Sequence, residues 1–234
     1  LLTDLTAESP ADQTAVVPTA APIPDPGATP TPKPAVSPTP AADAGIRLNV
    51  LRLASIDLFA MEALAQVDPA WESLSDTYLA CILDGYLGDA LPLYAWAWQP
   101  DREGYLPFQG SQPQIDTEEA ILTVLHLCEV GRIPEKSIAW IRDRLYNESA
   151  LYVAYHSGQG VAADSRESVA AYAMVARIAR IIGDENLYDS AVRRLLWHQA
   201  TSRTSVALAA IFRQQEDAIF VWGSDNIWAL LALH

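Results

Sequence analysis

The sequence predicts an all-α protein built as an α/α toroid, of which this chain supplies an incomplete arc of about seven helices in an inner and an outer layer. Two observations predict this fold. One helical hairpin is written twice between residues 115 and 203. In both copies, and along the rest of the chain, a helix that is apolar nearly all round alternates with an amphipathic one.

The two copies of the hairpin share their start and stop signals. Each copy opens with an aspartate that is followed two or three residues later by a glutamate, and its first helix is expected to end at a glycine. Asp116 and Asp164 lie 48 residues apart, and Gly131 and Gly183 lie 52 residues apart. Such a period is typical of stacked helical units.

The alternation of helix types predicts the two layers. A helix that is apolar on all faces has to be covered on all sides, whereas an amphipathic helix needs cover on one side only. Hairpins joined in this way place every inner helix in the same direction. We therefore expect the N-termini of the inner helices to meet at one face, and the seven helices to leave the ring open.

The helix boundaries follow from caps and periodicity. Asp68 precedes a proline at a first helical position, and Ser224 or Asp225 is expected to cap the last helix. Residues 88–114 are rich in Gly, Pro and aromatic residues and predict a long ordered loop, and the AIFVW stretch within 201–222 has strand-like composition. The expected helices are 46–67, 69–87, 116–131, 134–147, 165–183, 185–199 and 225–234.

Residues 1–45 have a different composition from the domain expected over residues 46–234. Ten of the sixteen prolines lie there, interleaved with Ala, Thr and Ser. Proline fixes φ and removes a backbone donor, so the segment is expected to be extended and unpacked. It is either a spacer of the kind found in secreted or surface-anchored proteins, or an insertion in a larger domain.

Charge and hydropathy exclude several classes of partner. The net charge of −14 argues against nucleic acid and against anionic membrane surfaces. No apolar run reaches the roughly 18 residues of a transmembrane helix. The histidines show no metal-ligand spacing, and the chain has no nucleophile elbow, phosphate-binding loop or dinucleotide fingerprint. We therefore expect no metal and no cofactor.

Acidic residues begin the expected inner helices. Asp116, Glu118, Asp164 and Glu167 would gather at the convergent face, together with the Asp225-Asn226 pair. Helix capping explains each of them singly. As a group they could bind ligand hydroxyls or act as acid and base, and glycoside hydrolysis requires two carboxylates that flank the scissile bond.

Aromatic residues crowd the loop 88–114. Rings in loops beside polar groups suit sugar binding, because an aromatic face stacks on the apolar face of a pyranose. The alternative is that the rings plug the top of the toroid. The expected substrate-binding residues are Tyr94, Trp96, Trp98, Tyr105, Asp225 and Asn226.

Several stretches resemble the later hairpins of glycoside hydrolase family 8-like proteins, which are six-hairpin glycosidases, many of them secreted by bacteria. The resemblance covers residues 46–234. It lies in LASIDLFAMEALAQVDPAWESL, GYLGDALPLYAWAWQPDREGY, IDTEEAILTVLHLCEVG, ESVAAYAMVARIARIIGDENLYDSAVRRL and SDNIWALLAL.

The resemblance implies an (α/α)6 toroid whose cleft binds and cleaves β-glucan, chitosan or xylan. The general acid of that family is a glutamate in the first hairpin, which has no counterpart here. Asp57 lies in the stretch that corresponds to the family's Pro-Ser-Tyr segment, but this sequence has Leu53-Ala54-Ser55 there. Asp57 is therefore only a weak catalytic candidate.

The sequence leads to one main hypothesis and two rivals. The main hypothesis is the C-terminal half of a glycoside hydrolase-like toroid that acts on or binds a polysaccharide, with its catalytic acid in an absent N-terminal half and an extracellular or cell-surface location. The first rival is a non-catalytic carbohydrate-binding or scaffold module on a surface spacer. The second is a helical repeat protein that binds other proteins.

Overall fold

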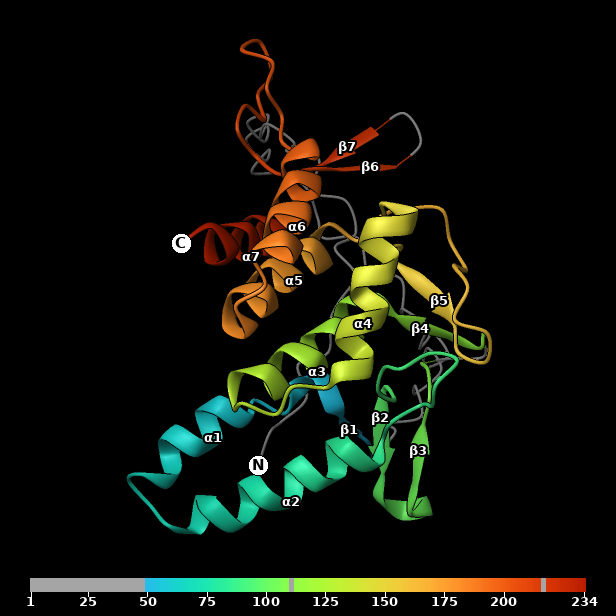
Figure 1. Ribbon diagram of the computed structural model, residues 1–234, viewed down its shortest axis with the longest axis vertical. Helices are drawn as coiled ribbons and strands as arrows, with labels where there is room; N and C mark the ends of the chain where they lie inside the picture. Colours follow the sequence, from blue (N-terminus) through green and yellow to red (C-terminus); the bar gives the residue numbers. More distant parts are fainter. Residues whose placement is uncertain (1–48, 110–111, 216–217) are drawn as a thin grey trace, which may run out of the picture. The chain divides into compact units, whose positions relative to one another are not determined.

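Seven α-helices and several short strands make up the computed structural model, which describes residues 49–109, 112–215 and 218–234 (Figure 1). The spacer or insertion expected over residues 1–45 lies outside the described residues. The seven helices confirm the helical part of the all-α fold that the sequence predicts, but small sheets are present as well, so the fold is mostly helical rather than all-α. They are α1 Leu58–Ala65, α2 Ala70–Asp84, α3 Thr117–Glu129, α4 Glu135–Asp143, α5 Val169–Ile182, α6 Glu185–Trp197 and α7 Gly223–Leu233.

The strands form three small antiparallel sheets among the described residues. The largest has the order β1-β2-β3, and the other two are the pairs β4-β5 and β6-β7. The strand-like composition of the AIFVW stretch is confirmed, since β7 lies in it. The strands are β1 Leu51–Arg52, β2 Ala97–Gln99, β3 Gly104–Leu106, β4 Gln114–Asp116, β5 Ala154–His156, β6 Arg213–Gln215 and β7 Ala218–Phe220.

The single helix expected over residues 46–67 is wrong in its first part. Residues 51–52 form β1, which pairs with β2, and residues 53–55 form a 3₁₀ turn. The helix begins only after Asp57, whose carboxylate accepts a hydrogen bond of 2.9 Å from the backbone N–H of Ala60. The periodicity was misleading because a buried strand and a buried helix have the same apolar composition.

The loop expected over residues 88–114 is also more ordered than predicted. It contains β2 and β3, which pair with each other through Trp98 and Tyr105 and other residues. Burial explains the pairing, because Ala95, Ala97 and Gln99 are all buried and their backbone groups need partners.

Two helices begin at other residues than predicted. α5 starts at Val169 rather than near residue 165, because Ser168 donates its backbone N–H to the carbonyl of Leu151 and Val153 donates to that of Arg166. α7 starts at Gly223, so Asp225 lies in its first turn instead of capping it. The glycine stops are confirmed: Gly131 and Gly183 both have φ of 72° after α3 and α5.

The odd-numbered helices form a row in which α1 contacts α3, α3 contacts α5, and α5 contacts α7, while α2 pairs with α1 and α6 with α5 (Figure 1). α5 is covered on nearly all sides, and its small alanine side chains let the neighbouring helices α3, α6 and α7 pack closely against it. Its alanines 170, 171, 173, 176 and 179 are all buried. The prediction of a helix apolar all round and buried all round is confirmed for α5.

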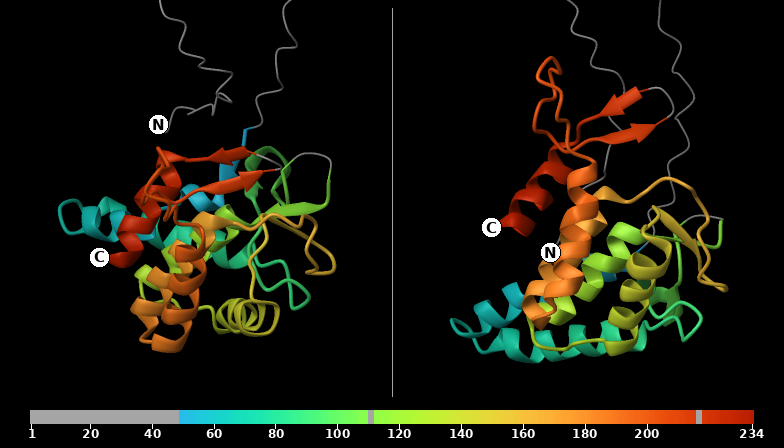
Figure 2. Two further views of the ribbon diagram at one scale, coloured as in Figure 1. Left: turned by 90° about the horizontal axis from the view of Figure 1, so that it is seen from above. Right: turned by 45° about the horizontal axis from the view of Figure 1, so that its top comes forward.

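α1 and α7, the helices at the two ends of the row, are apolar like α5 but are not covered on all sides by other elements. In α1, the side chain of Phe59 is 59% exposed, and in α7 the side chain of Leu230 is 71% exposed. The β6-β7 hairpin, which projects from the start of α7, likewise exposes Ile219 and Phe220 (Figure 2). α1 and α7 therefore present apolar surface that no described residue buries.

Enlarging a buried alanine of α5 tests its central place. We expect Ala173→Leu to lower the free energy of unfolding by about 2 kcal/mol, because added methyl groups in a packed core force neighbouring side chains off their rotamers. Urea unfolding followed by circular dichroism measures the change. Ala80→Leu, on the exposed face of α2, is the control and should change stability little; equal effects of the two substitutions would contradict the assignment of α5 as the packed centre.

Candidate functional site

A polar cleft lies beside the N-termini of α3 and α5. Its volume is about 410 Å³. Its walls combine one indole ring with amide, carboxylate and guanidinium groups. The lining residues are Trp96, Gln109, Gln112, Gln114, Ile115, Asp116, Val153, Ala154, Asp164, Arg166 and Arg213.

The β4-β5 pair positions this cleft. β4 runs directly into α3, and Asp116 at the end of β4 pairs with Ala154 of β5. The next residue, Thr117, donates its backbone N–H to the carbonyl of Val153 at 3.1 Å. The start of α3 is therefore bound to the segment that leads into α5, and the polar residues of both segments face one space.

Arg213 joins the beginnings of α7 and α3, and through Glu118 it is linked to the beginning of α5. Its guanidinium forms a bidentate ion pair with Asp225 in the first turn of α7, where Nε donates to Oδ2 at 2.5 Å, and it contacts Glu118 in the first turn of α3 at 2.8 Å. Glu118 also accepts a hydrogen bond of 3.2 Å from Ser168, the residue before α5. The starts of α3, α5 and α7 therefore lie together, as the sequence predicts for these three helices.

We call the contacts of Arg213 with Asp225 and Glu118 the junction. Its two carboxyl groups have different electrostatic surroundings. Burial raises the pKa of Glu118, Arg213 opposes the rise, and the nearby Asp116 and Asp225 add to it. Hydrogen bonding to Asp225 is the main reason that the pKa of Arg213 is raised. Asp225 itself is fully buried, so it depends on this arginine for its charge partner.

Asp164 and Arg166 form a second ion pair on the cleft wall. Arg166 donates to Asp164 from its backbone at 2.8 Å and from its guanidinium at 2.6 Å. These hydrogen bonds lower the pKa of Asp164 and keep it ionised. Arg166 and Arg213 both line the cleft, and the positive charge of Arg213 counteracts part of the rise in the pKa of Arg166.

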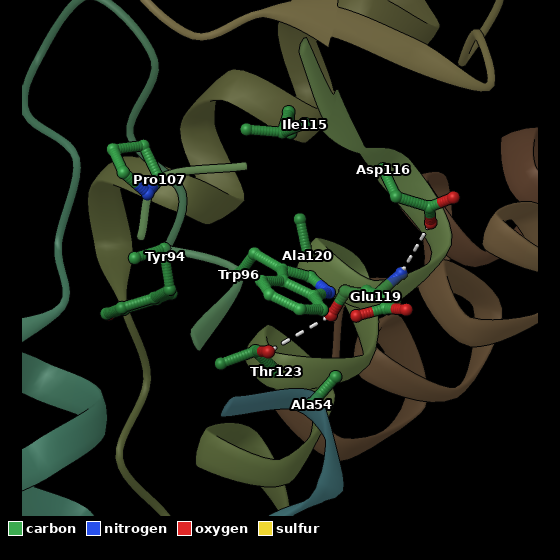
Figure 3. Close-up of a pocket in the computed structure, with 10 residues that line it drawn as sticks. Ala54, Tyr94, Trp96, Pro107, Ile115, Asp116, Glu119, Ala120 and Thr123 are labelled. Atoms are coloured by element: carbon green, nitrogen blue, oxygen red, sulfur yellow. Dashed lines mark hydrogen bonds between the residues drawn. The ribbon is translucent and has the colours of Figure 1, made fainter. Parts of the chain in front are cut away.

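A smaller hollow lies behind Trp96, next to the first turn of α3 (Figure 3). Glu119 borders it and pairs with Arg52 of β1, which joins that strand to α3. Burial raises the pKa of Glu119, and Arg52 opposes the rise. The buried indole N–H of Trp96 makes no hydrogen bond of good geometry, yet it is near enough to Glu119 to oppose the rise as well.

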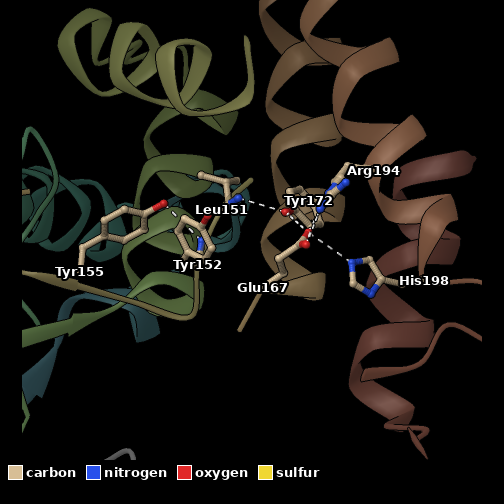
Figure 4. Close-up of polar contacts among 7 residues, drawn as sticks. All are labelled: Leu151, Tyr152, Tyr155, Glu167, Tyr172, Arg194 and His198. Carbon is tan, nitrogen blue, oxygen red and sulfur yellow. Dashed lines mark hydrogen bonds and ion pairs between the residues drawn. The ribbon is translucent and has the colours of Figure 1, made fainter. Parts of the chain in front are cut away.

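Glu167 does not line the cleft, and its carboxylate lies in a polar network between α5 and α6 (Figure 4). Its carboxylate accepts hydrogen bonds from Tyr172 at 2.5 Å and from Nε of Arg194 at 2.7 Å, and His198 lies at 3.4 Å. Burial alone would raise the pKa of Glu167, but these partners lower it to about 2. Tyr172 in turn accepts a hydrogen bond from the backbone of Leu151.

The structure separates the residues that the sequence proposed for substrate binding. Trp96 lines the cleft. Tyr94 is buried and packs edge to face on Tyr86, and Tyr105 packs on Trp98 and donates its hydroxyl to the carbonyl of Cys81. Asn226 donates to the carbonyl of Ile211 and accepts from its backbone N–H, so it fixes the segment before β6.

The proposed catalytic residues are also divided. Asp116 and Asp164 line the cleft, and Glu118 lies behind Arg213. Asp116 caps α3 by accepting the backbone N–H of Glu119 at 3.0 Å, as its position in the sequence predicts. Asp57 caps α1 and does not line the cleft. Among the described residues, no group of three or more His, Cys, Asp and Glu side chains is placed to hold a metal ion.

Sequence reasoning missed the cations of the site. Arg166 follows Asp164 by two residues and was visible as a local partner, but Arg213 lies in a segment without periodicity, and its partners are 12 and 95 residues away. The three glutamines of the cleft wall gave a weak signal, because Gln109, Gln112 and Gln114 lie in a Gly- and Pro-rich stretch typical of any loop.

Comparison with known proteins places the fold beside an enzyme of carbohydrate metabolism. No protein-family model matches the sequence, and no curated protein matches it. Among solved structures, a novel alpha-amylase from Clostridium perfringens is 29% identical over 79% of this chain, with a TM-score of 0.72. The structure of PssZ from Listeria monocytogenes is 13% identical over 82% of this chain and 71% of its own, with a TM-score of 0.45.

The match to the amylase supports the coarser part of the sequence-based expectation. This chain resembles a glycosidase in structure, with mostly helical architecture and small sheets. It covers 54% of the amylase chain and therefore spans about half of its length. Membership of glycoside hydrolase family 8 stays a prediction. None of the helices in the described ranges is long and apolar enough to cross a membrane.

The buried ion pair of α7 supplies a test of the junction. We expect Asp225→Asn to lower the free energy of unfolding by about 3 kcal/mol, because removing one partner of a buried pair leaves the other without compensation. Chemical denaturation measures this loss. Asp189→Asn, on the exposed side of α6, is the matched control. Equal stability of the two variants would show that Arg213 does not need Asp225.

The Glu167 network predicts a pH-dependent difference. The pKa of Glu167 in the folded chain is about 2, below the ordinary value of 4.5, so its stabilisation is complete above pH 4.5 and is lost as the pH falls toward 2. We expect Glu167→Gln to cost about 2 kcal/mol at pH 7, and we expect the gap to the parent chain to shrink below pH 4.5. Urea unfolding between pH 3 and 7 measures it. Glu185→Gln at the exposed start of α6 is the control, and a gap that is constant with pH would contradict the assignment.

Proposed function

We propose that this chain forms about half of an α/α toroid of the six-hairpin glycosidase type, and that its cleft binds a glucan. The observation that carries the proposal is the cleft itself. It places an indole ring beside two carboxylates, two guanidinium groups and three amides at the N-termini of neighbouring helices. A ring for stacking and convergent hydrogen-bonding groups for hydroxyls suit a sugar better than an apolar ligand.

The choice of glucan rests on the comparison. The matched Clostridium perfringens protein is an alpha-amylase, which favours α-linked glucans as the first ligands to test. The resemblance of the sequence to family 8 instead implies β-glucan, chitosan or xylan. Cello- and chito-oligosaccharides and xylan are therefore the comparison ligands in every binding experiment.

The exposed apolar ends support the toroid. α1 and α7 lie at the two ends of the row of odd-numbered helices. Both expose large apolar side chains, among them Leu64 and Ile227. Soluble proteins rarely expose contiguous apolar surface of this kind, so further hairpins would cover it. The chain also spans only 54% of the matched amylase. Residues 1–45 would then be a spacer or an insertion of an extracellular or surface-anchored protein.

The carboxylates of the described cleft are better suited to binding than to catalysis. Asp164 is ionised and paired with Arg166, and Asp116 is engaged in capping α3. Glu118 alone among the five acidic candidates combines a raised pKa with a place at the junction. If the assembled toroid hydrolyses glycosidic bonds, Glu118 is the group here that is best suited to hold a proton, and the second group would come from the other half.

A non-catalytic carbohydrate-binding module is the second candidate. The same ion pairs favour it, since a cleft in which charges already neutralise one another binds neutral hydroxyls without changing protonation state. The two candidates share the cleft and differ only in turnover. Reducing-sugar release from starch by the assembled toroid separates them, because under both candidates we expect the 234-residue chain alone to bind starch without release.

Removing the cleft ring tests the binding site. We expect Trp96→Ala to weaken binding of maltoheptaose by about tenfold, because the indole is the only ring that lines the described cleft and a stacking contact contributes about 1 kcal/mol or more. Isothermal titration calorimetry measures the affinity. Trp98→Ala, two residues away and outside the cleft, is the matched control and should bind like the parent chain.

Two results would contradict the proposal. One is that the folded parent chain binds none of the α- or β-linked oligosaccharides. The other is that Trp96→Ala and Trp98→Ala reduce affinity equally while both retain the circular dichroism spectrum of the parent chain.

A further inference from the structure

Another hollow lies between the end of α4 and the end of α6, apart from both the cleft and the hollow behind Trp96. Its volume is about 240 Å³, and it shares no lining residue with the cleft. One wall comes from the turn after α4, and the other comes from the last two turns of α6. The lining residues are Leu145, Ser149, Ser190, Arg193, Arg194 and Trp197.

Trp197 supplies the hollow with an exposed aromatic ring. It is the last residue of α6, and its side chain is 70% exposed, although an indole is among the most favourable side chains to bury. The guanidinium of Arg194 lies 4.5 Å from the centre of its ring. One part of the ring is therefore covered by a cation, and most of it remains open to a ligand.

The network of Glu167 holds this arrangement in place. Arg194 forms an ion pair with Glu167, which also accepts from Tyr172 and approaches His198 (Figure 4). The Arg194 side chain is thus fixed at one end by a carboxylate and lies over Trp197 at the same time. A ring oriented in advance loses little entropy when a ligand stacks on it.

The wall after α4 supplies the hydroxyl group of Ser149, and α6 supplies a second hydroxyl group, that of Ser190. Ser149 follows a π-helical turn over Arg144–Glu148 and has a φ of 58°, in the left-handed region that residues other than glycine rarely adopt. Single π turns and such backbone conformations recur at functional sites. Among the described residues, none forms a hydrogen bond with the hydroxyl of Ser149 or that of Ser190, and the buried Leu145 adds an apolar surface to the hollow.

We propose that this hollow is a second carbohydrate-binding site, in which a pyranose stacks on Trp197 and its hydroxyls bond to Ser149, Ser190 and Arg193. The choice of a sugar rests on the proposed function, because a second site is useful where the cleft takes the same polymer. The net charge of −14 disfavours an anionic ligand here, where Arg193 is the one arginine of the hollow without an ion pair among the described residues. A neutral ligand with an apolar face and many hydroxyls fits all six residues.

A polymer that reaches both sites would bind more tightly than a short oligosaccharide, because the second contact is intramolecular. Affinity electrophoresis of the 234-residue chain through gels that contain glycogen or soluble starch measures polymer binding, and calorimetry with maltoheptaose measures each site. We expect Trp197→Ala to lose about tenfold in polymer affinity and Trp197→Tyr, which keeps a ring, to lose less. Trp222→Ala, another exposed tryptophan outside both hollows, is the matched control.

The pattern of variants separates this proposal from the proposed function. If Trp96→Ala weakens binding and Trp197→Ala behaves like Trp222→Ala, the cleft stands and the second site is overturned. If only Trp197→Ala weakens binding, the second site stands and the function proposed for the cleft fails. A parent chain that is folded and binds no polymer overturns both, and tighter binding of a phosphorylated sugar than of its neutral parent would overturn the neutral ligand class.

Discussion

The contact of Arg213 with Asp225 and Glu118 is the constraint on which the site depends. Asp225 is fully buried, and a buried carboxylate without a cation would cost several kcal/mol. Arg213 therefore has to reach the start of α7 from β6, and Glu118 has to meet it from α3. One guanidinium fixes where the β6-β7 hairpin, α3 and α7 lie relative to one another, and it forms part of the cleft wall at the same time.

Packing around α5 makes this junction possible. The buried alanines of α5 let α3 and α7 approach it from two sides, which brings their first turns within reach of one arginine. Larger residues would move both helices outward and lengthen the contacts of Arg213. The polar junction and the small-residue helix are thus two parts of one arrangement: the alanines set the distances, and the ion pairs select which ends of the helices meet.

The positions of most helices could be predicted from the sequence, but the contacts between the helices could not. Helix positions followed from local signals such as Asp116 as a cap and Gly131 and Gly183 as stops, and these hold in the structure. Apart from β7, the short strands were missed because two or three residues carry too little periodicity, and because pairing of Leu51 with Trp98 is a property of the folded chain. The meeting of acidic residues at one face was predicted from helix direction, whereas the cations that neutralise them come from distant segments and could not be.

The balance of charge at the cleft also bears on how the two halves of the proposed toroid would share binding and catalysis. A group that donates a proton has to be held neutral, and a group that attacks or activates water has to be free of a permanent cation. Here Asp164 is paired with Arg166, and Arg213 opposes the rise in the pKa of Glu118. These pairs keep the wall rigid and ready to accept hydroxyls, which suits the orientation of a sugar chain. In the proposed toroid, Glu118 would be the proton-holding group on this side, and the second reactive group would face this wall from the opposite half.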